Sequence, residues 1–401
     1  MNTFPIPVLF ASVFSLFAVS VSPSSAQDRI ASGQDGDVSL KLEIERAISR
    51  GTAFLTGQQN PETGAWSDET LPALSALAIS AILGDPSLEP DAALPAVTEK
   101  GYEFLLGNVK SDGGIYGKGL ATYNTALSMM ALLQSGKEEY LPVVAKARRL
   151  LINQQQDYDK RGESDNLFDG GIGYGGSYAH SDLSNTHLAL EALHYSKKAL
   201  TDTEFDDSEE FDLDWDAAIA FVSRTQNSEE SVAKLGEWAG LREEDKGGFV
   251  YFPGDTKSGE LTVQTEAGEK TALRSYGSMS YAGLLAFIYA DMDPTDPRVG
   301  AAMEWLQRNF TLEENPGLEA QGLFYYYHTM SKALAITGTK TLVTPEGQKI
   351  NWKQDLALEL MSRQLPDGSW INAGSNRWME DDSILVTAYS LLTLQQVYRA
   401  L

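Results

Sequence analysis

The sequence contains no cysteine among its 401 residues. Disulfide bonds, thiolate nucleophiles and cysteine-based metal sites are therefore excluded, so stability must come from packing. Basic residues are also few, because 31 Lys and Arg stand against 56 Asp and Glu, a formal net charge of −25. A field of this sign repels nucleic acid and anionic lipid surfaces, so we expect no nucleic-acid partner.

Long hydrophobic runs are absent except at the N-terminus. Residues 1–26 carry no charge and end in small residues at Ser24, Ser25 and Ala26, a pattern typical of a secretory signal peptide. We expect cleavage after Ala26 and an exported protein, periplasmic or extracellular. Because the leader lacks the usual basic start, an uncleaved anchor is the alternative. No second span follows, so residues 27–401 should form a single domain without a transmembrane span after cleavage.

An internal repeat is the main feature of the sequence. The stretch 57–66 reads GQQNPETGAW, and residues 362–370 repeat its order of Gln, Pro, a polar-Gly pair and Trp. Internal repetition outranks any local pattern as a guide to architecture. Looser copies at 107–117, 153–176, 224–252 and 306–327 bring the number of units to six.

Each unit combines two helical patterns around its turn. Before the turn, apolar residues recur three and four apart with charge on the other side; after it, the helix is apolar nearly all round. A helix without a polar face must be covered on every side, which predicts two layers with the apolar helices inside. The amphipathic segments are 47–55, 97–106, 144–152, 217–226, 301–310 and 355–365. The apolar segments are 73–83, 125–133, 186–193, 281–290, 329–336 and 384–394.

The repeated turn motif favours a structural role over a chemical one. Its Asp-Gly-Gly or Thr-Gly pairs supply positive-φ turns, the aromatic residue fills the wedge between neighbouring hairpins, and the Gln can satisfy carbonyls at the outer helix end. Segments 252–275 and 341–352 read as β-hairpin insertions at the rim, the second turning at Pro345-Glu346-Gly347. The acidic stretch 201–216 reads as a solvated loop whose last carboxylates favour a helix N-terminus, with a cation site as the alternative.

Two of these turns resemble a known family. Gln58 to Trp66 and Gln364 to Trp370 resemble the Gln-Trp repeats of squalene and hopene cyclases. Segments 181–193, 325–334 and 382–394 resemble inner helices of the wider terpenoid cyclase and protein prenyltransferase superfamily. The resemblance covers residues 40–401. It implies an all-α fold, an (α/α)6 toroid of six helical hairpins with small β-hairpin insertions, whose inner helices enclose an apolar cavity.

In such a toroid, polar residues in the first turns of the inner helices converge on one mouth. The candidates for ligand binding are Tyr123, Asn185, His187, Tyr276, Tyr327 and Trp378. The candidates for catalysis are Asp182, His328, Asp381 and Asp382. Each has a structural alternative: helix N-capping for the three aspartates and a hydrogen-bonded packing role for His328. His187 and His194 are seven residues apart, which is not the usual zinc spacing, so no metal or other cofactor is expected.

The resemblance allows two chemistries to be tested residue by residue. Cyclases of the squalene-hopene type use the middle Asp of an Asp-x-Asp-Asp-Thr motif as the proton donor, and Asp182-Leu183-Ser184-Asn185-Thr186 places Ser184 there. A serine cannot protonate an alkene. Tyr327-His328-Thr329 resembles a zinc-ligand stretch of protein prenyltransferases, but their Asp-x-Cys is replaced by 276–280, and the chain has no cysteine.

These observations favour an exported toroid that binds a hydrophobic isoprenoid or lipid ligand and that is, at most, a divergent terpenoid cyclase-like enzyme. One alternative is a noncatalytic scaffold that offers its rim insertions to a protein partner. Another is a polysaccharide-active enzyme, since α/α toroids also host carboxylate-dependent glycan chemistry and the mouth is rich in Tyr, Trp and Asp.

Overall fold

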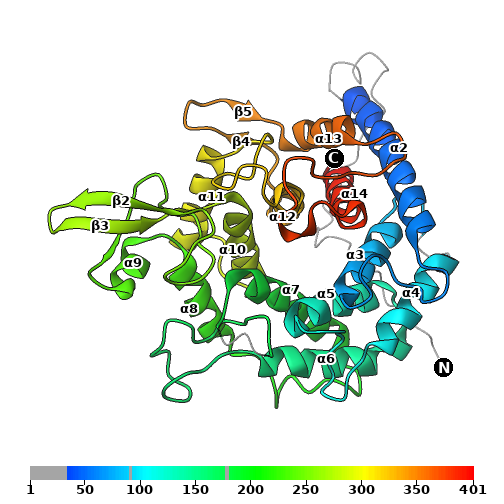
Figure 1. The fold of residues 1–401 in the computed structure, drawn as a ribbon, viewed down its shortest axis with the longest axis horizontal. Coiled ribbons are helices and arrows are strands. Elements are labelled where there is room, and N and C mark those ends of the chain that lie inside the picture. The colour runs from blue at the N-terminus through cyan, green and yellow to red at the C-terminus, as the bar shows by residue number, and fades with distance from the viewer. Residues whose placement is uncertain (1–33, 90–92, 177–179) are drawn as a thin grey trace, which may run out of the picture.

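The computed structural model describes residues 34–89, 93–176 and 180–401. The predicted signal peptide, residues 1–26, lies outside them. The described chain is mostly helical, with a few short strands (Figure 1). All twelve segments predicted to be helical are helices.

The six amphipathic segments form the helices that we call outer: α2 (Gln34–Gln58), α4 (Ala96–Gly107), α6 (Leu141–Asn153), α8 (Trp215–Thr225), α11 (Pro297–Arg308) and α13 (Trp352–Arg363). The six apolar segments form the inner helices: α3 (Pro72–Leu83), α5 (Ala121–Gln134), α7 (Leu183–Leu200), α10 (Gly277–Tyr289), α12 (Leu323–Ile336) and α14 (Ser383–Ala400). The remaining helical pieces are short: η1 (Glu138–Tyr140), α9 (Glu229–Leu235) and η2 (Arg377–Met379).

The inner helices contact one another in a cycle. Each packs against the next along the chain, and α14 packs back against α3. The outer helices lie around this cycle, and the last of them, α13, contacts both α14 and α2 (Figure 1). Inner helices such as α3 and α10 are buried along nearly their whole length, as their uniformly apolar sequences require.

Glutamine side chains of the repeated turns tie neighbouring units together. Gln59 Nε2 donates to the carbonyl of Gly64 in its own turn and to that of Val97 in the next outer helix, at 2.8 Å each. Gln364 Nε2 donates in the same way, at 2.9 Å, to the carbonyls of Gly368 and Ala47. The glutamine therefore reaches the neighbouring outer helix rather than the end of its own. Since Ala47 lies in α2, the last unit is bonded to the first.

The turn glycines allow the same close approach. Gly64 and Gly368 have φ values of 81° and 93°, in the region that favours glycine. A Cβ atom on Gly368 would lie 2.4 Å from the carbonyl oxygen of Arg50 in α2, and one on Gly64 would lie 2.5 Å from that of Lys100 in α4. A larger residue would force the outer helices apart at either position.

The tryptophans of the repeat are fully buried, in agreement with the wedge role predicted for them. Trp66 Nε1 donates to the carbonyl of Leu55, and Trp370 Nε1 donates to that of Leu360, both at 2.7 Å. Each indole thereby satisfies a carbonyl near the C-terminal end of the preceding outer helix.

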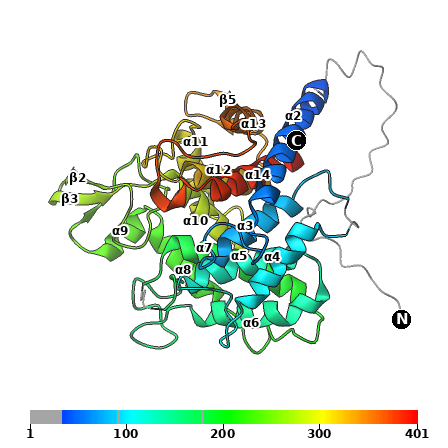
Figure 2. The same ribbon diagram turned by 45° about the vertical axis from the view of Figure 1, so that its right-hand side comes forward.

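Both predicted hairpins are confirmed. Strands β2 (Glu260–Thr265) and β3 (Gly268–Leu273) pair antiparallel, and the short β1 (Ala239–Gly240) joins β3 in parallel. Strands β4 (Leu342–Val343) and β5 (Lys349–Ile350) form the second hairpin. The β2–β3 hairpin projects away from the helices in both views (Figures 1 and 2).

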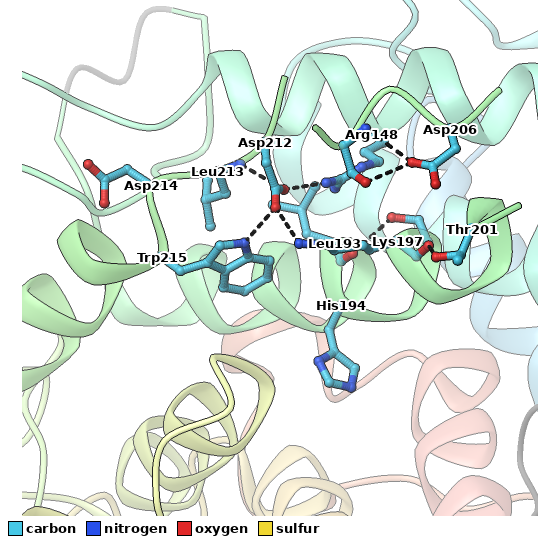
Figure 3. A network of polar contacts seen from close by, with 12 residues as sticks. Arg148, Leu193, His194, Lys197, Thr201, Asp206, Asp212, Leu213, Asp214 and Trp215 are labelled. Atoms are coloured by element: carbon cyan, nitrogen blue, oxygen red, sulfur yellow. Dashed lines mark hydrogen bonds and ion pairs between the residues drawn. The ribbon is translucent and has the colours of Figure 1, made fainter. Parts of the chain in front are cut away.

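The acidic stretch 201–216 is more than a solvated loop. Asp214 caps α8 by accepting the backbone N–H of Ala217 at 2.9 Å, as predicted for the end of this stretch. Asp212, however, turns toward α6 and α7, where it pairs with the buried Arg148 and, at 2.6 Å, with Lys197 (Figure 3). Trp215 Nε1 also donates to this carboxylate, at 3.1 Å. The loop is thus fixed to both helix layers.

Candidate functional site

Side chains from non-neighbouring inner helices meet inside the cycle. The phenols of Tyr123 of α5 and Tyr389 of α14 are close enough to influence each other's pKa, although α3 lies between their helices in the cycle. Lys332 of α12 and Glu191 of α7 form an ion pair, although α10 lies between theirs. Because outer helices cover the other side, these contacts are made across the inner faces. The interior of the cycle is therefore where the inward-facing side chains converge.

The inner faces of α7 and α12 carry matching polar residues. On each helix these residues follow one another at spacings of three and four, which places them along one face. Tyr325 interacts with the Ser184 hydroxyl, His328 is close enough to His187 for their charges to interact, and Lys332 bonds Glu191. We call this double row the polar ladder; it comprises Ser184, His187 and Glu191 on α7 and Tyr325, His328 and Lys332 on α12.

The pair farthest from the N-terminal ends of the two helices is ionic. Lys332 Nζ donates to both carboxylate oxygens of Glu191, at 2.9 Å each. Both side chains are largely buried, with exposed fractions of 17% and 6%. A buried ion pair with this geometry is electrically neutral as a unit, so it adds no net charge to the interior.

His187 is held as a neutral imidazole. Its Nδ1 lies 2.7 Å from the carbonyl oxygen of Ser184, and since a carbonyl can only accept, Nδ1 carries the proton. Burial lowers the pKa of His187 to about 4, while the nearby charges of Glu191 and Lys332 act in opposite directions. The remaining nitrogen, Nε2, is therefore an acceptor at neutral pH.

His328 carries a buried ring nitrogen that is unsatisfied. Its ring stacks on Tyr389 at 5.4 Å between centroids with an interplanar angle of 25°, and only 8% of the residue is exposed. Burial holds the pKa of His328 well below its usual range, assisted by Lys332 and His187. Its Nδ1 atom is buried and has no hydrogen-bond partner in the described structure. Such an atom costs free energy unless something binds to it.

Asp182 lies fully buried at the start of α7. It caps this helix, as predicted, because Oδ1 accepts the backbone N–H of Asn185 and Oδ2 accepts the Asn185 side-chain amide, both at 2.8 Å. Burial raises the pKa of Asp182 to about 6, against the opposing effect of these bonds and of one with Tyr251. A catalytic role for Asp182 stays a prediction.

Tyrosines surround Asp182 at this end of the inner helices. The hydroxyls of Tyr251 and Tyr174 are 3.5 Å apart, and Tyr276 is the N-cap residue of α10. Burial raises the pKa of both Tyr251 and Tyr276, so their phenols stay neutral. With Tyr123, Tyr325 and Tyr389, they make this part of the interior aromatic, with the Asp182 carboxyl among the neutral phenols.

The opposite side of the interior is apolar. On α5, Leu127 and Met130 follow Tyr123 at spacings of four and three, which places them on its face. On α14, Leu385 and Leu392 lie four residues before and three after Tyr389. The interior therefore has a polar side, formed by α7 and α12, and an apolar side that includes α5 and α14.

Other predicted site residues lie away from the ladder. Tyr327 is buried and donates its hydroxyl to the carbonyl of Leu312. Asp382 caps α14, as predicted, by accepting the backbone N–H of Ile384 at 2.8 Å, whereas Asp381 is exposed. Trp378 is 45% exposed and lies under the guanidinium of Arg377, which is 4.4 Å from the ring centroid.

Glu380, the neighbour of the predicted residues Asp381 and Asp382, is the buried carboxyl of this cluster, although it was not itself among the predicted site residues. Its Oε1 accepts the backbone N–H groups of Phe324 and Tyr325 at 3.0 and 2.9 Å, and its Oε2 accepts the Asn372 amide at 2.6 Å. Burial raises the pKa of Glu380 to about 7 despite these bonds. Glu380 thus holds the first turn of α12, which carries Tyr325.

The ladder as a whole was also missed from the sequence. Ser184, Glu191, Tyr325 and Lys332 were not among the predicted site residues, although His187 and His328 were. The available signal was a polar row at spacings of three and four on two helices that are otherwise apolar.

Among the residues that the structure describes, no group of three or more His, Asp and Glu is arranged to hold a metal ion. Within the same residues, no helix combines the length and the apolar character needed to cross a membrane.

The chain has a terpenoid cyclase-like α/α-toroid fold. It is similar to solved structures of the type II terpene cyclase MstE from Scytonema. One is a variant in complex with geranylgeranyl dihydroxybenzoate, described as its substrate, with a TM-score of 0.52, 12% identity and coverage of 91% of this chain and 99% of that chain. Another is a variant in complex with merosterolic acid A, described as its product, with a TM-score of 0.53, 14% identity and the same coverage. The apo enzyme matches with a TM-score of 0.52 and 12% identity over 90% of this chain and 99% of that chain. No protein-family model matches the sequence, and no curated protein does either.

Proposed function

We propose that this chain is an exported (α/α)6 toroid of six helical hairpins that binds a hydrophobic, isoprenoid-like ligand in its interior. The cycle of inner-helix contacts and the bond from Gln364 to Ala47 support closure of the six hairpins into a ring. The N-terminal pattern of residues 1–26 supports export.

The observation that carries the binding proposal is the character of the interior. Tyrosine rings and aliphatic side chains line it, its histidines are neutral, and the charged pair Lys332–Glu191 is internally compensated. An interior of this kind suits a hydrocarbon ligand with little charge. Two of the MstE structures hold geranylgeranyl dihydroxybenzoate and merosterolic acid A, and we extend the geranylgeranyl ligand class, as a proposal, to this chain.

Binding is favoured over cyclisation started by an acid. Ser184 occupies the position that resembles the proton donor of squalene-hopene cyclases, and its hydroxyl faces Tyr325. Asp182 is nearby, but both of its oxygens accept hydrogen bonds from Asn185, and a carboxyl with a pKa of about 6 is too weak to protonate an alkene. We therefore propose no protonation step.

Native mass spectrometry of the exported protein, followed by lipid extraction, tests this proposal. We expect an isoprenoid-sized ligand, or saturable binding of added geranylgeraniol. The variant Leu127→Trp places a bulky ring on the inner face of α5 and should abolish binding. The control Leu358→Trp changes an exposed position of outer helix α13 and should bind normally.

Three outcomes would count against the proposal. A protein that carries no lipid and does not bind geranylgeraniol would contradict it. Binding of oligosaccharides in place of lipids would favour the polysaccharide-active alternative. Equal binding by Leu127→Trp and wild type would place the ligand outside the interior and favour the scaffold alternative.

A further inference from the structure

The polar ladder lies on one side of the interior, and the side that includes α5 and α14 is apolar. The three pairs of the ladder lie one turn apart along α7 and α12, so they extend from the N-terminal ends of these helices toward their middle. Helix α10 lies between α7 and α12, and its Tyr289 is next to Glu191. Ala282 and Ala286 lie seven and three residues before Tyr289, on the same face of α10. Because these side chains are small, they leave room for the residues of α7 and α12 to meet. The three pairs therefore follow one another along the side of the interior that α7 and α12 form.

The middle pair of the ladder leaves hydrogen-bonding capacity unused. His328 Nδ1 is buried and has no partner, and His187 Nε2 is an acceptor because Nδ1 donates to Ser184. Tyr325 comes near Ser184, yet its hydroxyl forms no hydrogen bond of normal geometry in the described structure. A group that both donates and accepts would satisfy these atoms, and a hydroxyl does both.

The charges on the ladder exclude an ionised group at the same place. The one cation of the ladder, Lys332, is bonded to both oxygens of Glu191. The two histidines carry no charge at neutral pH, because burial lowers the pKa of each. A carboxylate or diphosphate there would be a buried anion without a free counter-charge, which is strongly unfavourable.

Building on the proposed function, we infer that the ligand is an uncharged isoprenoid alcohol, whose hydroxyl group binds between His187, His328 and Tyr325 and whose hydrocarbon chain lies against α5 and α14. The apolar residues Leu127, Met130 and Leu392 form the surface for the chain. The ladder selects against the diphosphates and carboxylates of otherwise identical chains.

A matched ligand series tests this inference on the full-length exported protein. Dissociation constants are measured at pH 7.5 for geranylgeraniol, geranylgeranoic acid, geranylgeranyl diphosphate and the unfunctionalised hydrocarbon of equal length. The alcohol should bind about tenfold more tightly than the hydrocarbon, the gain expected from one or two net hydrogen bonds. The acid and the diphosphate should bind at least about tenfold more weakly than the alcohol, since each loses more than that on burial of an unpaired charge.

Single-residue variants test whether the preference for the alcohol depends on His328 and Tyr325. His328→Phe keeps the ring that stacks on Tyr389 and removes Nδ1, so the affinity for the alcohol should fall to that for the hydrocarbon, whose own affinity should not change. Tyr325→Phe should act in the same direction. The control Tyr116→Phe removes a surface hydroxyl that bonds Asp112 and should change neither. Circular dichroism establishes that each variant is folded, and Tyr325→Phe replaces His328→Phe if the latter is not.

The outcomes separate this inference from the proposed function. Equal affinity for alcohol and hydrocarbon, or an acid or diphosphate that binds as tightly as the alcohol, would overturn the inference while the interior ligand site stands. Equal losses of alcohol and hydrocarbon binding in His328→Phe would also overturn it. Failure of all four compounds to bind would overturn both.

Discussion

Glu380 shows how one buried carboxyl can organise a site that it does not enter. It bonds two backbone N–H groups in the first turn of α12 and the amide of Asn372. These bonds fix the end of the helix that presents Tyr325 and His328 to the interior. Burial raises the pKa of Glu380 from 4.5 to about 7, so this carboxyl gains or loses its proton close to neutral pH.

The raised pKa of Glu380 makes stability pH-dependent. A carboxyl whose pKa is higher in the folded state stabilises the fold below its unfolded pKa of 4.5 and loses that contribution as the pH rises through about 7. Glu380→Gln keeps an acceptor for both N–H groups without a charge. Relative to wild type, it should therefore gain roughly 3 kcal/mol in free energy of unfolding between pH 4.5 and 8.5. Urea denaturation at several pH values measures this difference.

Glu380→Ala is the matched control, because it removes the acceptor as well as the charge. It should be less stable than Glu380→Gln at every pH by about 1–3 kcal/mol, since the N–H groups of Phe324 and Tyr325 then lose their partner. A difference between wild type and Glu380→Gln that does not vary with pH would contradict this explanation.

Local sequence motifs predicted the caps Asp182 and Asp382 correctly, whereas Asp381 caps no helix, and these motifs could not predict the ladder. Asp182 and Asp382 each precede an apolar helical run, and a cap depends only on neighbours in the sequence. Lys332 and Glu191 meet only because α7 and α12 approach each other across α10, a tertiary relation that one helix does not encode. The role of Glu380 could not be predicted for the same reason, since its partners Phe324 and Tyr325 lie in another unit.

In the acidic segment 201–216 too, the sequence predicted local features but not contacts with other elements. Its charge pattern predicted a solvated loop and a helix cap, and Asp214 confirms the cap. The pairing of Asp212 with Arg148 and Lys197 was not predicted, because these cations lie on two other elements, α6 and α7 (Figure 3). The twelve helices of the repeat and the two hairpin insertions, in contrast, were predicted, because each depends on the pattern of residues within one short segment.

Two ion pairs of this loop should differ sharply in their contribution to stability. Arg148 is 1% exposed, so Asp212→Asn leaves a buried cation without its carboxylate partner. This change should lower the free energy of unfolding by about 3–5 kcal/mol. Arg149 is 59% exposed, and its partner Asp207 lies in the same loop, so Asp207→Asn should cost less than about 1 kcal/mol. Chemical denaturation of both variants at pH 7 makes the comparison. Similar costs for the two would show that Asp212 does not anchor the loop.

The molecule as a whole depends on contacts between its first and last units. Gln364 bonds the carbonyl of Ala47, Gly368 packs against the carbonyl of Arg50, and α14 packs on α3. The same turn chemistry joins units that are adjacent in the sequence, as at Gln59 and Gly64. The repeat thus predicted turns that could connect neighbouring units. It did not predict that the last turn would contact the first helix, because an open array would use the same residues.

The most direct test of the account is to find where a bound ligand lies. A diazirine-bearing analogue of geranylgeraniol is photolysed on the purified protein, and the labelled peptides are identified by mass spectrometry. We expect adducts on inner helices, on the faces that carry Leu127 and Met130 of α5 and Leu392 of α14. Adducts confined to outer helices such as α13 or to the β2–β3 hairpin would contradict an interior ligand site.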